Sequence, residues 1–168
     1  MGSKKRLVFH ALDDMGVHNL NIRQGVIYSP SFLNLLVGYN SSLYANFNNN
    51  QEKENVFESI RQEYYPLMPS RLDSLYCFND YETANKMNID WWGGSRKIFK
   101  VRILSREEID IPIDTNNFRL NYDEFDLNIL DLNISHKEMA HKYFSKKYTD
   151  NPVLEVLING CVKAVDYE

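Results

Sequence analysis

The sequence has few of the features that mark metal-binding, disulfide-linked or membrane-spanning proteins. Its two cysteines, Cys77 and Cys161, lie far apart in apolar segments and have no metal-ligand spacing, so they suggest neither a zinc site nor a disulfide framework. No apolar run is long enough to span a membrane. The start, Met1 to Arg6, lacks the apolar stretch and cleavage site of a secretory signal. These absences favour a cytoplasmic protein with no membrane partner.

Motifs of several enzyme classes are also missing. Gly93-Gly94 lacks the lysine and the following helix of a phosphate-binding loop, and no serine lies in a nucleophile elbow. His136 and His141 are five residues apart on one predicted helix, which does not place them on the same face for zinc. The carboxylates of the acidic, irregular region 109–134 do not have the spacing of a calcium loop. We therefore interpret that region as a solvated face and expect no metal.

The length and composition of the chain are typical of one globular domain. The chain has 168 residues, of which 43% are hydrophobic and 25% charged, and this is enough to bury a core. The formal net charge of −4 gives no overall basic footprint for nucleic acid, although a local basic patch remains open. We expect a single α+β domain over residues 1–168, as a monomer or a weak dimer.

Local patterns predict an alternation of strands and helices. Strands are expected at 7–12 and 96–104, a strand or irregular segment at 25–28, and a turn that runs into a strand over 69–78. Helices are expected from Ser29, over 52–65, from Asn79 to about Met87, and from the capping box at Ser135. Turns are expected at 13–16 and 91–94, and a long surface loop at 39–51. In the strand at 96–104, Arg102 is expected to point outward.

The C-terminal segment carries the strongest local signal. Asn159-Gly160 separates two apolar runs, 153–158 and 161–165, and this pattern predicts a β-hairpin because both positions of its turn need positive φ. Glu155 is the only charged residue in the first run. Burying an unpaired carboxylate is costly, so Glu155 must lie at an edge, be paired, or line a wet cleft.

The stretch 69–78 is a second candidate site. Alternation places Ser74, Tyr76 and Phe78 on one face of the expected strand. Small hydroxyl and aromatic groups on one face suit a cleft for a flat, polar ring. The alternative is an ordinary half-buried strand.

Together these segments carry a resemblance to a known superfamily. Phe9-His10 in the first strand, a middle strand with serine and aromatics after the Ser-Arg-Leu segment 70–72, and the late Glu-Val-Leu-Ile strand 155–158 follow one another along the chain. The chain in this respect resembles the ADP-ribosyltransferase-like superfamily, most of all its diphtheria-toxin-type branch with a His, a Tyr and a Glu. It is also similar to an uncharacterised bacterial domain family that we place in the same superfamily.

The resemblance implies a fold of two small packed sheets with short flanking helices, split around a cleft that holds NAD. In that fold Glu155 matches the catalytic glutamate, and His10 matches the histidine that hydrogen-bonds the ribose or the nicotinamide region. Tyr76 would stack on the nicotinamide ring, and Ser74 would support the cleft or the carboxylate. Ser70 and Arg71 would complete the cofactor site, with Arg71 at the pyrophosphate unless it forms a structural ion pair.

The implied chemistry suits these residue types. Breaking the bond between nicotinamide and ribose develops positive charge on the ribose, which a nearby carboxylate stabilises in a site of low dielectric. In arginine-modifying members a second acidic residue precedes the glutamate by two positions. The residue here is Val153, which argues against arginine as the acceptor.

The expected function is therefore transfer of ADP-ribose from NAD to an unknown acceptor, which is a protein, a nucleic acid or a small molecule, or hydrolysis of NAD. Three alternatives stay open: a degenerate member that binds a nucleotide, one that binds a protein, and a phosphotransferase acting on RNA 2′-phosphates. The last is disfavoured by the acidic charge balance. By analogy, a small isolated domain of this type would be a bacterial toxin or defence effector.

Overall fold

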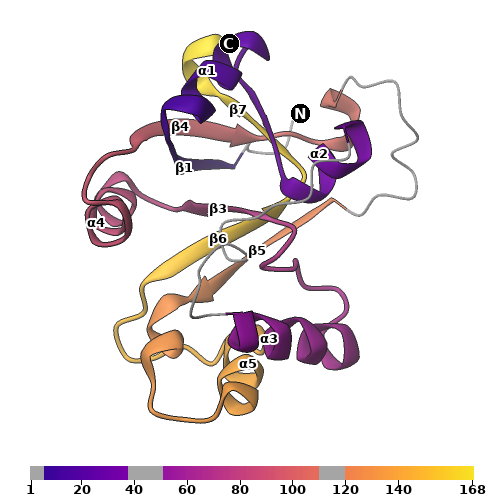
Figure 1. The fold of residues 1–168 in the computed structure, drawn as a ribbon, viewed down its shortest axis with the longest axis vertical. Helices are drawn as coiled ribbons and strands as arrows, with labels where there is room; N and C mark the ends of the chain where they lie inside the picture. Colours follow the sequence, from indigo (N-terminus) through magenta and orange to yellow (C-terminus); the bar gives the residue numbers. More distant parts are fainter. Residues whose placement is uncertain (1–5, 38–50, 110–119) are drawn as a thin grey trace.

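A computed structural model describes residues 6–37, 51–109 and 120–168, which form a mixed α+β fold around one antiparallel sheet (Figure 1). The strands are β1 (Leu7–Leu12), β2 (Val26–Tyr28), β3 (Leu75–Phe78), β4 (Lys97–Ile103), β5 (Asn121–Asp126), β6 (Leu154–Asn159) and β7 (Cys161–Ala164). The helices are α1 (Asp14–Ile22), α2 (Pro30–Val37), α3 (Gln51–Tyr64), α4 (Tyr81–Trp92) and α5 (His136–Phe144), with short 3-10 turns η2 (Arg106–Glu108), η3 (Leu127–Asp131) and η4 (Val165–Tyr167). The expected α+β class is confirmed.

The sheet has seven strands in the order β2-β7-β4-β1-β3-β6-β5, and its two halves meet between β1 and β3. Strands β1 and β4 pair along the whole of β1, from Leu7 opposite Arg102 to Leu12 opposite Lys97. In contrast, the described residues of β1 and β3 form a single bridge pair, Phe9 with Phe78. The backbone hydrogen bonding between the halves is therefore sparse.

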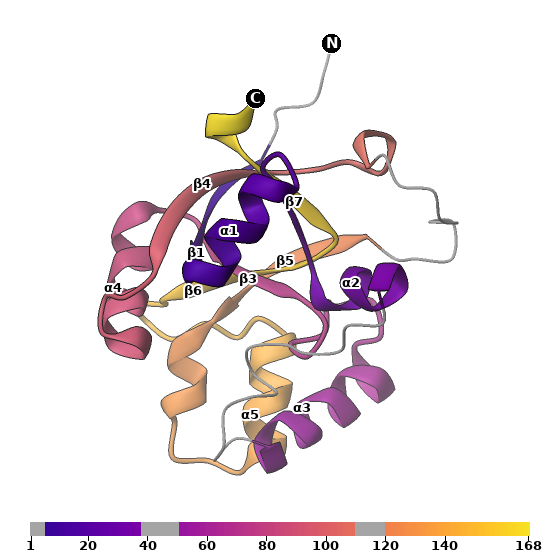
Figure 2. The same cartoon turned by 45° about the horizontal axis from the view of Figure 1, so that its top comes forward.

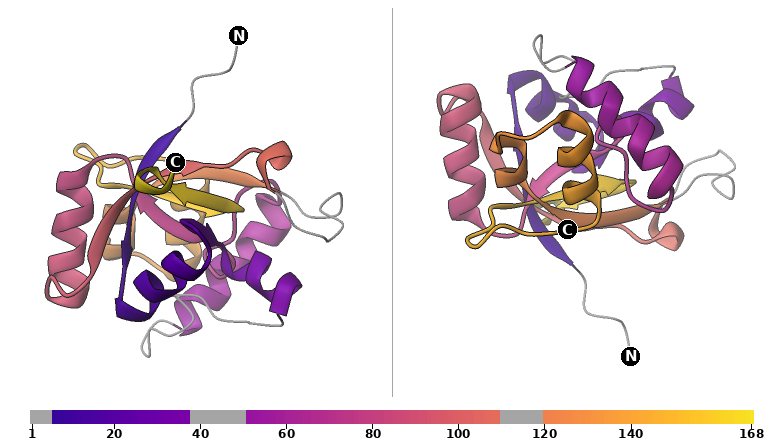
Figure 3. Two further views of the ribbon diagram at one scale, coloured as in Figure 1. Left: turned by 90° about the horizontal axis from the view of Figure 1, so that it is seen from above. Right: turned by 90° about the horizontal axis from the view of Figure 1, so that it is seen from below.

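Helices cover both faces of the sheet. Leu20 of α1 packs on one face with Val8, Cys77 and Val156, and Figure 2 shows α1 lying across that side of the strands. On the other face, α3 and α5 pack side by side against β3, β5 and β6. Seen from below in Figure 3, α5 lies between α3 and α4. Because both faces are covered, β3 and most of β6 are buried on both sides.

The predicted C-terminal hairpin is wrong. Strand β6 pairs with β3 and β5, whereas β7 pairs with β4 and β2, so the two strands are not neighbours. Neither Asn159 nor Gly160 has a positive φ. The backbone of Ser29 donates to the Gly160 carbonyl at 2.8 Å, and the Ser29 Oγ accepts from the Gly160 N–H at 3.2 Å. A Cβ at Gly160 would come within 3.2 Å of Leu120. The glycine therefore allows close packing where the chain passes from one half of the sheet to the other.

Two helices differ from the predicted pattern. The segment expected to turn at 13–16 instead begins α1, because the Asp13 carboxylate accepts from the Gly16 N–H at 2.7 Å and caps the helix. Helix α4 continues past Met87 to Trp92, and Gly93 ends it in the left-handed region with φ of 62°. The expected turn at 91–94 is thus the end of a longer helix, which places two tryptophans on α4.

Arg102 was expected to point outward but is buried. Its Nη1 donates to Glu108 at 2.5 Å and its Nε donates to Glu168 at 2.5 Å. The two acidic partners come from η2 and the C-terminal end of the chain, so the strand pattern gave no sign of them. The loop expected at 39–51 lies almost entirely outside the described residues, as does 110–119 of the acidic region. The described remainder of that region forms β5 and η3.

Candidate functional site

Glu155 lies on β6, between β3 and the edge strand β5, and its side chain is completely buried. It is directly opposite Phe78 on β3 and Phe125 on β5. Its Oε1 accepts hydrogen bonds from Arg71 Nη1 at 2.7 Å and from the Tyr143 hydroxyl at 2.6 Å. Of the three placements that the sequence left open for this carboxylate, the structure shows the paired one.

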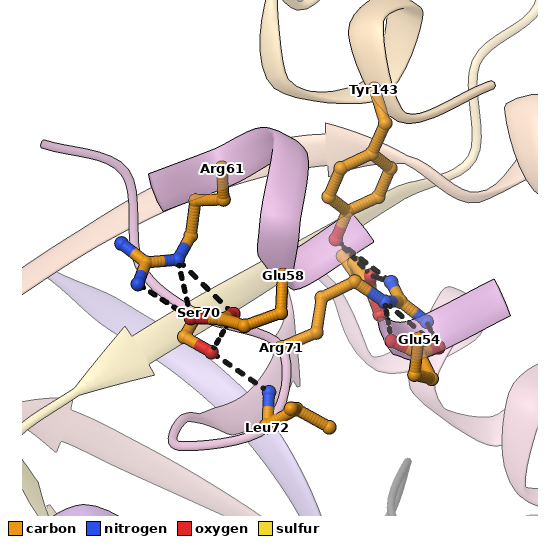
Figure 4. A network of polar contacts seen from close by, with 8 residues as sticks. Glu54, Glu58, Arg61, Ser70, Arg71, Leu72 and Tyr143 are labelled. Carbon is orange, nitrogen blue, oxygen red and sulfur yellow. Dashed lines mark hydrogen bonds and ion pairs between the residues drawn. The ribbon is translucent and has the colours of Figure 1, made fainter. Parts of the chain in front are cut away.

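Arg71 connects Glu155 to a second buried carboxylate. Its Nε and Nη2 contact the Glu54 carboxylate at 3.0 Å, and its Nη1 also donates to the Tyr143 hydroxyl at 2.9 Å. Figure 4 shows the guanidinium between Glu54 and Tyr143. Arg71 and Glu54 are almost fully buried, at 2% and 1% exposed. Charges removed from water in this way are tolerated only when they are paired and hydrogen-bonded.

Local sequence explains how the three partners reach Glu155. Glu54 precedes the buried Phe57 by three positions on α3, so it shares that helix's inner face. Tyr143 lies on the buried stripe of α5, whose N-cap Ser135 was correctly predicted, and its ring stacks on Phe125 with centroids 4.5 Å apart. Burial, followed by the charge of Glu155, raises the pKa of Tyr143 well above its usual value. The phenol therefore keeps its proton and acts as a donor.

Ser70 does not contact this network directly. Its Oγ donates to Glu58 Oε2 at 2.5 Å and accepts from the Leu72 N–H at 3.2 Å. Arg61 donates to the same Glu58 carboxylate (Figure 4). Ser70 in this arrangement holds the loop before β3 to α3, and so holds Arg71 in place.

His10 and Tyr76 form the second part of the site. His10 Nδ1 lies 2.8 Å from the Tyr76 carbonyl, and the two rings meet edge-on with centroids 5.8 Å apart. Since a carbonyl only accepts, Nδ1 carries the proton and Nε2 is the acceptor nitrogen of the neutral ring. Burial lowers the pKa of His10 to about 4, so it is uncharged at neutral pH.

The Tyr76 ring is part of an aromatic cluster. It stacks on Trp92 with centroids 5.9 Å apart and meets the edge of Trp91 at 6.2 Å. Both tryptophans come from the end of α4 that the sequence analysis assigned to a turn, so their contribution was missed. Nearby on the chain, Ser74 is 2% exposed, and its Oγ has no hydrogen-bond partner among the described residues.

The structure thus groups the candidate residues in two clusters. Arg71 and Glu155 form one with Glu54 and Tyr143, while His10 and Tyr76 form the other. The β3–β6 register places Tyr76 opposite Leu157, two residues from Glu155, so both clusters lie along the same pair of strands. Glu54 and Tyr143 were not among the predicted site residues. One signal for Glu54 was present in the sequence, which is its position three residues before Phe57 and six before Ile60, on the buried face of α3.

A pocket of about 410 Å³ lies beside the Glu155 network. Lys53 of α3, Arg71, and Lys86 and Trp91 of α4 line it, together with Val153, two residues before Glu155. His10, Ser74 and Tyr76 are not among its lining residues. Arg71 lines the pocket, and its Nη1 donates to Glu155, so one residue of the pocket wall is in direct contact with the buried carboxylate.

Within 6–37, 51–109 and 120–168, no cluster of three or more His, Cys, Asp or Glu side chains is arranged to hold a metal ion. In the same part of the chain, no helix has both the length and the apolar character needed to cross a membrane.

Fold and site together define a mixed α+β protein with a seven-stranded antiparallel sheet and a buried Glu–Arg–Glu network. Residues 33–167 match the profile of a family described as protein of unknown function (DUF2441), and the chain belongs to that family. The comparison with curated proteins found no match.

Proposed function

We propose that this protein cleaves NAD and transfers its ADP-ribose to an acceptor, with Glu155 stabilising the positive charge that develops on the ribose. The observation that carries the proposal is a buried carboxylate held by two side-chain donors at 2.6 and 2.7 Å, on the strand that pairs with the strand of Tyr76. Preorganised charge in a site without water is a large contributor to catalysis, because it requires no reorganisation as the reaction proceeds.

The groups around His10 support our placing of the dinucleotide along β1 and β3. The one described bridge pair between these strands, Phe9 with Phe78, supports a sheet that splits into two halves beside His10. The neutral His10 offers Nε2 as an acceptor for a ribose hydroxyl. The buried hydroxyl of Ser74 lacks a described partner, as expected of a group that bonds a ligand. Tyr76 and its tryptophan neighbours supply the aromatic surface for nicotinamide.

Arg71 has a different role in this proposal from the one expected of it. Its guanidinium already serves Glu54, Tyr143 and Glu155, so we assign it to holding the catalytic carboxylate rather than to the pyrophosphate. Ser70 acts indirectly, because its hydrogen bond to Glu58 holds the loop that carries Arg71.

One observation favours a second candidate, a degenerate member of the same fold that binds a nucleotide without turning it over. Arg71 offsets the charge of Glu155, and both donors converge on the same oxygen, Oε1. A carboxylate with its charge compensated in this way stabilises an oxocarbenium ion less well. Catalysis and simple binding therefore need to be separated by experiment.

The test measures NAD binding by calorimetry and nicotinamide release by chromatography for wild type, Glu155→Gln and Glu54→Gln. The two variants are matched, since each removes one buried carboxylate that contacts Arg71. We expect Glu155→Gln to bind NAD but to lose at least about a hundredfold in nicotinamide release. Glu54→Gln should lose far less.

Equal losses in the two variants, at equal thermal stability, would contradict a catalytic role for Glu155. Binding without release by the wild type, with or without cell extract as a source of acceptor, would favour the degenerate binder. No NAD binding at all would overturn both candidates.

A further inference from the structure

Three cationic side chains line the pocket beside the Glu155 network, together with two exposed carboxylates, Asp90 and Asp131. Lys53, Arg71 and Lys86 reach it from three separate segments, namely α3, the loop before β3, and α4. Lys53 and Lys86 form no ion pair with any carboxylate in the described part of the chain. The Arg71 charge is shared by Glu54 and Glu155, which do not line the pocket.

Lys53 is a half-buried cation in the wall of this pocket. Its pKa is lowered, first by burial and then by the charge of Arg71. Glu54, Asp131 and Glu155 act in the opposite direction but do not outweigh these two effects. An anion bound beside Lys53 would stabilise this lysine, because a half-buried charge gains more from a partner than an exposed one does.

The remaining lining groups restrict the shape of the ligand. The Trp91 ring, with apolar side chains of α4, η3 and Val153, suits a flat ring. Asp90 and Asp131, which are exposed, can accept hydrogen bonds from hydroxyl groups. A volume of about 410 Å³ fits a ligand of mononucleotide size. A nucleoside monophosphate is a ligand with a flat ring, hydroxyl groups and one anionic group.

We infer that this pocket binds the acceptor of the reaction, and that the acceptor is a phosphate monoester of mononucleotide size. The inference rests on the proposed function, since it names the substrate that receives ADP-ribose. Its structural basis is the position of the pocket, with Val153 and Arg71 in its wall and Glu155 directly behind Arg71. An anionic acceptor also agrees with Val153, because an acidic residue at this position is the one that arginine-modifying members carry.

The transfer is balanced without any further reactant. A phosphate oxygen of the acceptor attacks the ribose carbon that carries nicotinamide, and a new carbon–oxygen bond forms. The carbon–nitrogen bond breaks, and its electron pair neutralises the ring nitrogen of the departing nicotinamide. A phosphate monoester dianion has no proton to lose at the attacking oxygen, so the step needs no general base, and nothing is oxidised or reduced.

The experiment uses adenosine 5′-monophosphate as the probe, with adenosine and inorganic phosphate for comparison. Calorimetry on the full chain should show that the monophosphate binds and that adenosine binds much more weakly. Lys86→Ala and Lys53→Met should each weaken monophosphate binding by about tenfold, as expected for loss of one charged contact. Lys100→Ala is the matched control, because Lys100 is an exposed lysine on β4 that does not line the pocket.

With NAD added, the monophosphate should speed nicotinamide release, and mass spectrometry should detect a product that joins ADP-ribose to it. Nicotinamide release without monophosphate binding, or with inhibition and no joined product, would overturn the inference and leave the proposed function standing. Monophosphate binding that depends on Lys53 and Lys86, in a protein that never releases nicotinamide, would overturn the proposed function and with it the acceptor role.

Discussion

Two carboxylates on neighbouring strands, Asp126 and Glu155, are both completely buried but are stabilised in different ways. Asp126, at the end of β5, accepts from the backbone N–H groups of Asn128 at 3.0 Å, Thr149 at 2.7 Å and Val153 at 3.2 Å. It also accepts from the Thr149 hydroxyl at 2.6 Å. Three of these four donors are backbone N–H groups, so Asp126 fixes the segment before β6 to the end of β5.

For Glu155, the hydrogen bonds that define its site come from the side chains of Arg71 and Tyr143. These donors belong to α5 and to the loop before β3, and they also form the link between the sheet and α3. Replacing a buried ion pair with apolar residues often stabilises a protein, so an ionic network in this position is weak support for a purely structural role. Under the proposed function, Asp126 serves the fold, whereas Glu155 serves the catalytic site.

The largest expected effect comes from removing the cation of the Glu155 network. Arg71→Leu leaves Glu54 and Glu155 buried without their partner, and we expect a loss of about 3–5 kcal/mol in the free energy of unfolding. Urea denaturation measures the loss. Arg6→Leu is the control, since its ion pair with Glu124 is partly exposed and should be worth less than about 1 kcal/mol. Equal losses of unfolding free energy in Arg71→Leu and Arg6→Leu would show that the buried network contributes no more to stability than a surface ion pair.

The next largest effect is the pH dependence of stability that comes from His10. Unlike Asp126 and Glu155, which are stabilised by hydrogen-bond donors, His10 is expected to be buried as a neutral group. Its folded pKa of about 4 lies below the ordinary 6.5, so the unfolded chain binds the proton more readily between these values. Stability should therefore fall as the pH is lowered from about 6.5 to 4, by about 3 kcal/mol in total from this residue. Subtracting the curve of His10→Gln isolates its share. A difference curve that is flat over this range would mean that His10 is not buried in neutral form.

The sequence predicted the parts of the site that local patterns control. The Ser135 cap and the apolar stripe of α5 were correct because capping and helical spacing depend on neighbouring residues. The strand positions of His10, Tyr76 and Glu155 were also correct, since alternation and apolar runs are local signals.

Long-range partners were not predictable in the same way. Glu54 and Tyr143 are separated from Arg71 by 17 and 72 residues along the chain, and no local pattern links them. The hairpin prediction failed for the same reason, because Ser29 pairs with Gly160 across 131 residues and the strands on either side of Gly160 join different neighbours in the sheet. Tertiary contacts there override the turn propensity of the Asn-Gly dipeptide.

The third prediction tests the structural side of the comparison. Asp126→Asn keeps the shape of the side chain but replaces an acceptor oxygen with an NH₂ group, which faces donors of residues 128, 149 or 153. We expect a loss of about 2 kcal/mol in stability, with nicotinamide release per folded molecule unchanged. Urea denaturation and the release assay measure the two quantities. A loss of release in well-folded Asp126→Asn would place Asp126 in the functional site and break the contrast with Glu155.

The smallest effect on stability is expected at Tyr143, where it also sharpens the role of Glu155. Tyr143→Phe keeps the ring stacked on Phe125 and removes only the hydroxyl, which donates to Glu155 and accepts from Arg71. Stability should fall by about 1 kcal/mol. If the hydroxyl holds Glu155 in its catalytic orientation, kcat for nicotinamide release should fall by at least about tenfold while KM for NAD stays nearly constant, since the loss appears only in the transition state. A variant that loses stability without a change in kcat would show that Tyr143 supports the core alone, and that Arg71 is sufficient to orient the carboxylate.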